Sequence, residues 1–205
     1  PANLGYSVGS GPPSADSMKR RNLVYILLAV VMAGLAMALA GPGLAQTSSQ
    51  GAPPLRGLVQ ESRPIIMPEA TAYSLFTQDA NSSHQVWYRI SGGDALFRQR
   101  LRVYQEQASP RPQNQLPPDT ALRHELTSNT PTGWFVLPTI KGVATYYFDG
   151  DHRIDTQDPW ESGRGVRLKH ARFSNGDLYE LGFEDQISLD DYNDLEIQVA
   201  VVRSP

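Results

Sequence analysis

Five carboxylates lie within eleven residues near the end of this chain, and any fold must offset their mutual repulsion. They fall between Glu184 and Asp194, and the wider segment from Asp177 to Glu196 contains no Lys or Arg. Two carboxylates about 5 Å apart at an effective dielectric near 20 repel by roughly 3 kcal/mol. A hard divalent cation is the simplest source of compensation, so this acidic stretch predicts a metal site.

The segments that flank the acidic stretch alternate apolar and polar residues. Their apolar positions are Tyr179, Leu181 and Phe183 before it, and Leu195, Ile197, Val199 and Val201 after it. A period of two is typical of a strand with one buried face. The sequence therefore predicts a hairpin that carries the acids on its connection, at one end of a sheet.

The acidic stretch supplies the expected metal ligands, which are Glu184, Asp185, Asp190, Asp191, Asn193 and Asp194. Calcium suits them because it accepts about six to eight oxygen ligands with loose geometry, whereas zinc prefers His or Cys. The alternative is a solvated acidic turn that binds no metal.

A second group of acids follows an apolar segment in the middle of the chain. Asp149, Asp151 and Asp155 imitate the start of a calcium-binding loop. An EF-hand would need Gly in the place of Ile154 and Glu in the place of Trp160, so this is not an EF-hand. The sequence is compatible with two interpretations of these three residues, a second metal site and an ordinary turn.

Two short motifs around the acidic stretch resemble a known family. Leu181–Asp185 reads LGFED and Asp191–Leu195 reads DYNDL, which is similar to the signature of an exported bacterial domain family of unknown function, numbered 4114. The likeness covers about Thr132 to Val202. The resemblance implies calcium binding, although Leu189 stands where the family has the first Asp of its D-x-D motif.

The N-terminal third of the chain is predicted to lie outside the folded domain. Residues 1–17 are interpreted as a non-native or disordered leader. Residues 18–45 have the basic, apolar and small-residue regions of a secretory signal, with cleavage after Ala45. Residues 46–67 are rich in Gln, Ser, Gly and Pro, which predicts a flexible linker, and residues 68–205 form one domain.

Several short apolar segments with turn residues between them predict an all-β fold. The segments are 86–90, 97–105, 134–140, 145–148, 166–173 and 178–183. Residues 119–126 are predicted as a short helix that interrupts them. This pattern indicates an antiparallel β-sandwich of jelly-roll type. The chain has no Cys and therefore no disulfide, so its stability must come from the core, to which a bound metal would add.

Three arginines share one face of the predicted strand 97–105. Arg98, Arg100 and Arg102 alternate with apolar residues. They are expected either to meet an anionic ligand or to pair with an acidic strand, for which Glu196 is one candidate.

The sequence favours a binding protein over an enzyme. It contains no metalloprotease spacing, no nucleophile elbow and no phosphate loop, so no catalytic residue is predicted. The net charge of -3 argues against a nucleic-acid partner. We expect no membrane contact except through the signal segment if it is not cleaved.

These observations predict a secreted, periplasmic or cell-surface module that binds Ca²⁺ and contacts an extracellular glycan or another surface component. The alternatives are a structural domain of the cell envelope and a carbohydrate-active enzyme. The candidates for stacking on a sugar ring are five aromatic side chains: Trp87, Trp134, Trp160, Tyr146 and Tyr147. Aromatic side chains in a sandwich are, however, more often part of the core. The ligand and the oligomeric state are not predicted.

Overall fold

The computed structural model describes residues 48–49, 51–128, 130–185 and 191–204. The predicted leader (1–17) and secretory signal (18–45) lie outside these ranges, as does Asp190. Within the described ranges, no helix is both long enough and apolar enough to cross a membrane.

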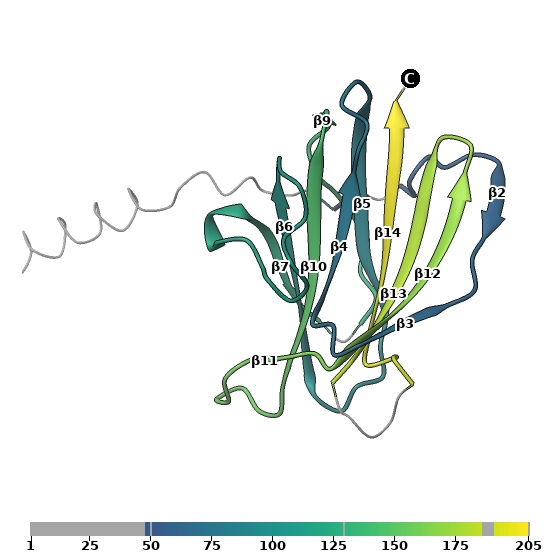
Figure 1. Cartoon of the computed structure of the whole chain (residues 1–205). Coiled ribbons are helices and arrows are strands. Elements are labelled where there is room, and N and C mark those ends of the chain that lie inside the picture. The colour runs from purple at the N-terminus through teal and green to yellow at the C-terminus, as the bar shows by residue number, and fades with distance from the viewer. Residues whose placement is uncertain (1–47, 50, 129, 186–190, 205) are drawn as a thin grey trace, which may run out of the picture. The chain divides into compact units, whose positions relative to one another are not determined.

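Two antiparallel sheets are packed together, and Figure 1 shows that the described chain consists of strands and the loops that connect them. The larger sheet has nine strands. Seven of them follow one another in the order β1 (Ser48–Ser49), β8 (Trp134–Val136), β5 (Ser83–Gly92), β14 (Leu195–Ser204), β13 (Gly176–Glu184), β12 (Gly165–Phe173) and β2 (Leu58–Glu61). Of the other two, β3 (Ile65–Pro68) also pairs with β12, and β9 (Ile140–Lys141) also pairs with β5.

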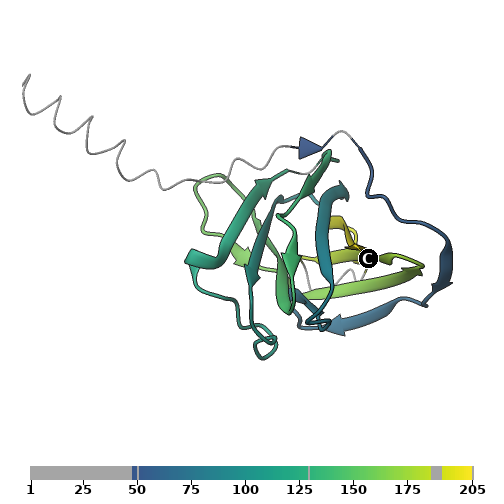
Figure 2. The same ribbon diagram turned by 90° about the horizontal axis from the view of Figure 1, so that it is seen from above.

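The smaller sheet covers one face of the larger one, as the view from above shows (Figure 2). It has five strands, with the order β11 (Glu161–Ser162), β10 (Ala144–Arg153), β6 (Arg98–Glu106) and β7 (Leu122–Thr127), with β4 (Ala72–Thr77) also paired to β10. A short 3₁₀ turn, η1 (Asp119–Ala121), precedes β7.

The core lies between the two sheets and is built from alternate residues of their strands. Tyr146 and Phe148 of β10, Leu101 of β6 and Ile197 of β14 are fully buried. Alternation places the intervening residues of each strand on the outer faces. The predicted antiparallel β-sandwich is confirmed, while the jelly-roll connectivity stays a prediction.

The predicted hairpin is formed by β13 and β14. Its register places Phe183 opposite Leu195 and Gly176 opposite Val202. The end of β13 and the start of β14 lie at the lower end of the sandwich in Figure 1, and the C-terminal end of β14 lies at the upper end. The hairpin therefore spans the length of the larger sheet.

Two segments differ from the sequence-based prediction. Residues 58–61 and 65–68, assigned largely to a linker, form β2 and β3 at the edge of the larger sheet. Both pair with β12 through main-chain hydrogen bonds, which do not require apolar side chains. Residues 122–127 form a strand instead of the predicted helix, because they pair with β6. The sandwich therefore begins before Pro68.

The arginine face of β6 pairs with β10, not with Glu196. Arg100 Nη2 lies 2.5 Å from Asp151 Oδ2, and Arg102 Nη2 lies 2.6 Å from Asp149 Oδ2. Glu196 belongs to the other sheet. The register explains the pairing, since Arg102 is directly opposite Asp149 and Arg100 is directly opposite Asp151.

The Arg102–Asp149 pair is expected to matter for stability because its carboxylate is buried. Asp149 is 1% exposed, and its burial raises the pKa of the carboxyl to about 6 even though Arg102 acts in the opposite direction. Removing one partner of a buried pair leaves an uncompensated charge, which costs more than the pair itself contributes.

We therefore predict that Arg102→Leu lowers the free energy of unfolding by about 3 kcal/mol, and that the double variant Arg102→Leu, Asp149→Leu recovers most of this loss. Urea denaturation of the single and double variants measures both quantities. The control is Arg111→Leu, which removes a more exposed pair with Glu106 and should cost less than about 1 kcal/mol. Equal losses in Arg102→Leu and Arg111→Leu would contradict the prediction.

Candidate metal centre

Three acidic side chains converge at the lower end of the hairpin. Glu184 ends β13, Asp185 follows it, and Asp194 directly precedes β14. One carboxylate oxygen from each lies within 4.8 Å of the others, and all three residues are buried. We refer to Glu184, Asp185 and Asp194 as the acidic triad.

Each carboxylate of the acidic triad accepts a hydrogen bond that orients it. Gln99 Nε2 donates to Asp185 Oδ2 over 2.8 Å, and the Asp185 main-chain N–H donates to Asp194 Oδ2 over 2.7 Å. The main-chain N–H of Tyr192 donates to Glu184 Oε2 over 3.2 Å. The three side chains are therefore held in place by both sheets and by the connection itself.

The residues before β14 fit tightly against neighbouring strands. Tyr192 is buried and has a φ of 55°, in the left-handed region. A Cβ on Gly182 would lie 2.1 Å from the Tyr192 carbonyl oxygen, and a Cβ on Gly93 would lie 2.5 Å from the Asp194 carbonyl oxygen. Only glycine allows the main chain to approach so closely at these two positions, and this approach brings Asp194 to the triad.

The electrostatics of the triad favour a cation. Burial raises the pKa of Asp185 above its usual range, and the charges of Glu184 and Asp191 add to this, while the hydrogen bond from Gln99 opposes it. Burial also raises the pKa of Asp194. Neither aspartate forms an ion pair with a Lys or Arg of the described residues. A bound cation would replace the missing positive charge.

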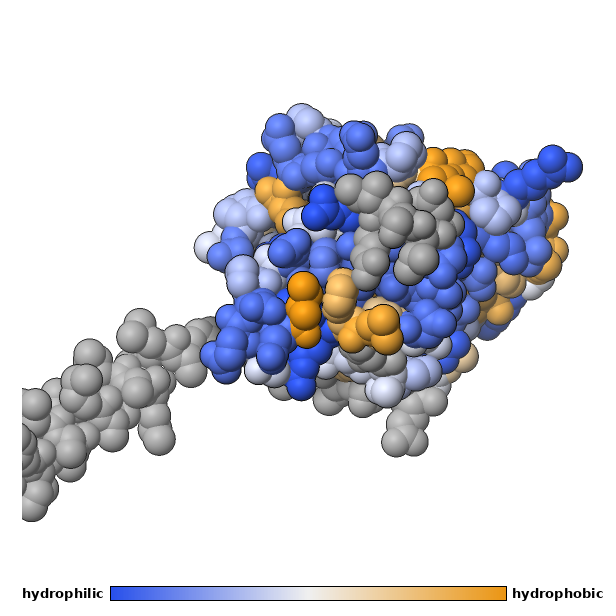
Figure 3. Space-filling view, turned by 90° about the horizontal axis from the view of Figure 1, so that it is seen from below, coloured by the Kyte–Doolittle hydropathy of each residue, from blue (hydrophilic) through white to orange (hydrophobic). Residues whose placement is uncertain are grey.

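The view from below shows that the surface around this end of the sandwich is largely hydrophilic (Figure 3). A few small hydrophobic areas interrupt it, and no broad apolar face is visible on this side. The triad itself lies beneath this surface, since its most exposed member, Asp194, is 7% exposed.

Two of the other three predicted ligands, Asp191 and Asn193, lie among the described residues, and their main-chain carbonyls take part in hydrogen bonds. Asp191 is exposed, and its carbonyl oxygen accepts a hydrogen bond of 2.8 Å from Arg167 Nη1. Asn193 presents its carbonyl oxygen to the main-chain N–H of Asp94 over 3.0 Å. Asp190 lies outside the described residues. A ligand role for these three residues stays a prediction.

The second group of acids does not converge. Asp149 and Asp151 are paired with arginines of β6, as described above, and Asp155 is an exposed residue that accepts a hydrogen bond from Thr156 N–H. Among the described residues, the acidic triad is the group whose oxygens lie close enough to hold one ion. A metal at Asp149 and Asp151 would have to displace two guanidinium groups.

The aromatic side chains expected to stack on sugars are largely covered. The guanidinium of Arg89 lies 4.7 Å from the ring centre of Trp134. Trp160 lies against both Arg100 and Arg153, each at 4.4 Å. Tyr146 and Tyr147 are buried, and Trp87 is half-buried on β5. The cation–π contacts hold Trp134 and Trp160 against the fold and take up ring faces that a sugar would need.

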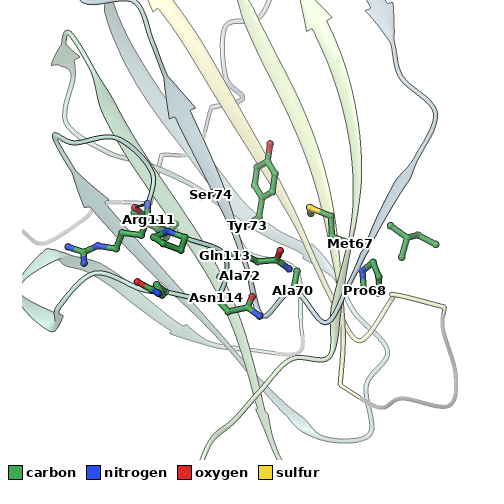
Figure 4. A pocket seen from close by; sticks show the side chains of 13 residues that line it. Met67, Pro68, Ala70, Ala72, Tyr73, Ser74, Arg111, Gln113 and Asn114 are labelled. Carbon is green, nitrogen blue, oxygen red and sulfur yellow. Dashed lines mark hydrogen bonds between the residues drawn. The ribbon is translucent and has the colours of Figure 1, made fainter.

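One cavity of about 650 Å³ lies beside β3, β4 and the segment 111–115 (Figure 4). One of its amide side chains is engaged in the fold, because Asn114 Nδ2 donates to the Glu69 carbonyl and Asn114 Oδ1 accepts from Thr71 N–H. Its one cationic side chain, Arg111, forms two hydrogen bonds of 2.9 Å with Glu106. No carboxylate side chain is among the described residues that line this cavity, in contrast to the triad.

Sequence reasoning missed four residues that contact the acidic triad or its connection. Gln99 is 86 residues away from Asp185 in the chain and belongs to the other sheet. Arg167, a base from β12, contacts the connection although the acidic stretch itself contains none. Gly93 and Gly182 carried no local signal beyond their identity. Only the strand order shows that these residues meet.

Comparison of the chain with family models, curated proteins and solved structures finds no match. The resemblance of LGFED and DYNDL to the exported family therefore stays a prediction.

We predict that Asp185→Asn and Asp194→Asn each weaken calcium binding by at least about tenfold, because each removes one charge from the ligand set with almost no change in volume. Isothermal titration measures the affinities. The metal-free variants should be no less stable than the parent, because a repulsive charge has gone.

The matched control for these variants is Glu196→Gln, since Glu196 lies on the outer face of β14 and pairs with Arg167 at 3.4 Å. Its calcium affinity should equal that of the parent. Asp191→Asn tests whether the exposed Asp191 adds a ligand. Identical affinities in all four variants would show that the triad does not bind calcium.

We also predict competition between protons and calcium. The raised pKa values of Asp185 and Asp194 mean that the metal-free folded state binds protons more tightly than the unfolded state does. Their protonation therefore stabilises the metal-free fold at low pH, and this contribution is lost as the pH rises through the folded-state pKa values. Calcium affinity changes in the opposite sense and decreases as the pH falls.

The measurement is the melting temperature from mildly acidic to neutral pH, with and without calcium, for the parent and for the double variant Asp185→Asn, Asp194→Asn. The parent minus variant difference isolates the triad from other titrating groups such as Asp149. A difference that does not change with pH in the metal-free state would refute the competition.

Proposed function

We propose that this chain is an exported β-sandwich whose acidic triad binds calcium and which acts as a binding or cell-surface interaction module. One observation carries the proposal. The oxygens of Glu184, Asp185 and Asp194 lie within 4.8 Å of one another in a buried position.

Calcium fits the donor set better than other common metals. The triad offers oxygen donors alone, and its members lie at the ends of two strands and on the connection between them. Zinc prefers nitrogen and sulfur donors, and magnesium requires a nearly regular octahedron with several waters. Calcium tolerates the irregular arrangement that carboxylates on one hairpin provide.

The burial of the triad favours a structural role for the metal within the module. Glu184 is 2% exposed and Asp185 is 6% exposed, so an ion held by them contacts the fold more than it contacts a ligand. An ion there ties the end of β13 to the start of β14 in a chain that has no Cys for a disulfide. This observation also supports the alternative of a purely structural domain of the cell envelope.

Export is part of the proposal and is supported by the sequence alone. The signal-like residues 18–45 lie outside the described part of the chain. The absence of Cys and the expectation of a millimolar extracellular calcium supply are compatible with metal stabilisation outside the cell.

We predict that removal of calcium lowers the stability of the protein. A metal that binds only the folded state contributes RT ln(1 + [L]/Kd), which is roughly 2.7 kcal/mol at a hundredfold excess over Kd. Excess chelator should therefore lower the melting temperature by about 5–10 °C for a domain of this size. Differential scanning calorimetry measures the shift.

The double variant Asp185→Asn, Asp194→Asn is the control, and its melting temperature should not respond to chelator. An unchanged melting curve in excess chelator, on parent protein that elemental analysis shows to be metal-free, would remove the metal from the proposed function.

A further inference from the structure

A second cleft lies at the opposite end of the sandwich from the acidic triad. It has a volume of about 300 Å³ and lies between the end of β4 in the smaller sheet and strands β5, β13 and β14 of the larger sheet. Its walls include Thr77, Asp79, His84, Asp177, Tyr179 and Arg203, and we call it the His84 cleft. Asp177 and Glu184 are seven residues apart on β13, which separates the two sites by about 24 Å.

His84 is a buried polar side chain in the wall of this cleft. It is 2% exposed, and its Nε2 lies 2.8 Å from the Tyr146 hydroxyl and 3.3 Å from Thr77 Oγ1. The Tyr146 hydroxyl in turn accepts a hydrogen bond from Gln105 Nε2 over 3.4 Å. Burial and the nearby Arg203 lower the pKa of His84, so the ring is neutral at pH 7.

Asp177 is the second buried polar group of the cleft and is held from two sides. It is 4% exposed, and its Oδ1 lies 2.8 Å from His170 Nε2. Its other oxygen accepts a hydrogen bond from Arg203. The His170 ring stacks on Tyr179, with 4.7 Å between ring centres and 10° between planes. Such support from behind is what holds a binding group in one orientation.

The charges of the cleft argue against an anionic ligand. Asp177 and Asp79 face one guanidinium, that of Arg203, because neutral His84 adds no charge. Asp79 at the surface is held ionised, since hydrogen bonds from Asn81 and Ser82 lower its pKa. The cleft therefore offers two carboxylates and one guanidinium for hydrogen bonding, with a slight excess of negative charge.

The remaining walls are apolar. Leu75, Phe76 and Val201 line the cleft beside these polar groups. The volume is at the lower end of the range for ligand sites, about 300–1,000 Å³, and suits one ring better than a chain. A ligand for such walls needs several hydroxyl groups, apolar C–H faces and no negative charge.

We propose that the His84 cleft binds a single neutral sugar ring, with Asp79, Asp177 and Arg203 as its hydrogen-bonding groups and His84 in the wall beside them. This deepens the binding role proposed above by naming a ligand class and a place. The site does not use calcium, because the triad lies at the other end of β13. It also does not use the three tryptophans, none of which lines the cleft.

The histidine rings provide the experiment, because the chain has only four of them. The probes are the methyl glycosides of glucose, galactose and mannose, titrated into ¹⁵N-labelled protein while the ring nitrogens are observed by NMR. At least one glycoside should shift His84 and His170 saturably, with a Kd of about 1 mM for so small a ligand. The rings of His124 and His152, which do not line the cleft, should not move.

Two variants separate binding in the cleft from binding elsewhere. Gln78→Trp places a large ring at the exposed rim and should weaken binding at least about tenfold without touching the core. Asp79→Asn should also weaken it, and the matched control Asp158→Asn, an exposed aspartate on the β10–β11 connection, should not. Equal affinity in Gln78→Trp and the parent would overturn the proposal.

Charged sugars and chelator supply the remaining outcomes. Glucuronate should bind more weakly than methyl glucoside, and glucosamine should bind no more tightly; the reverse in either case would reassign the cleft to an anion or to an amine. Saturable shifts should persist in chelator. If no neutral glycoside shifts His84 while calcium still raises the melting temperature of the same sample, the sugar site fails and the metal centre stands.

Discussion

Repulsion among the buried carboxylates of Glu184, Asp185 and Asp194 is the constraint on which the hairpin end of this structure depends. The strands themselves are stable on ordinary grounds, because alternate residues of β13 and β14 enter the core and the main chains pair along their length. Their connection is different, since it brings like charges together beneath the surface. Hydrogen bonds orient the three carboxylates, and the main chain packs closely at two glycines beside them. A bound cation would neutralise the remaining negative charge.

Other buried carboxylates of the sandwich are paired with basic side chains. On the smaller sheet, Asp149 and Asp151 lie directly opposite Arg102 and Arg100, so register alone supplies their counter-ions. At the far end of β13, Asp177 is shared between His170 and Arg203. Register and strand order therefore supply basic partners for the buried acids at these two places, whereas at the triad three carboxylate oxygens converge within 4.8 Å of one another, and this convergence is the reason for placing the metal there.

The sequence predicts those features that depend on neighbours along the chain. The β13–β14 hairpin follows from the alternation of residues 179–183 and 195–201, and the acids follow it to one end of the sheet. Features that depend on strand order were missed, such as the contact of Gln99 with Asp185 and the pairing of the β6 arginines with β10. Residues 58–61 were missed because edge pairing uses the main chain, and residues 122–127 because pairing with β6 overrides a local helical signal.

The position of β14 has a mechanical consequence. This strand lies inside the larger sheet and is paired along nearly its whole length with β5 on one side and β13 on the other. A tension applied along the axis of β14 would load both hydrogen-bond ladders in shear, so that many bonds must fail together. A peeling load on an edge strand such as β2 would break its bonds one after another. The acidic triad lies where β13 connects to β14, so an ion bound there would cross-link the two strands at the point where a shear load on β14 reaches β13.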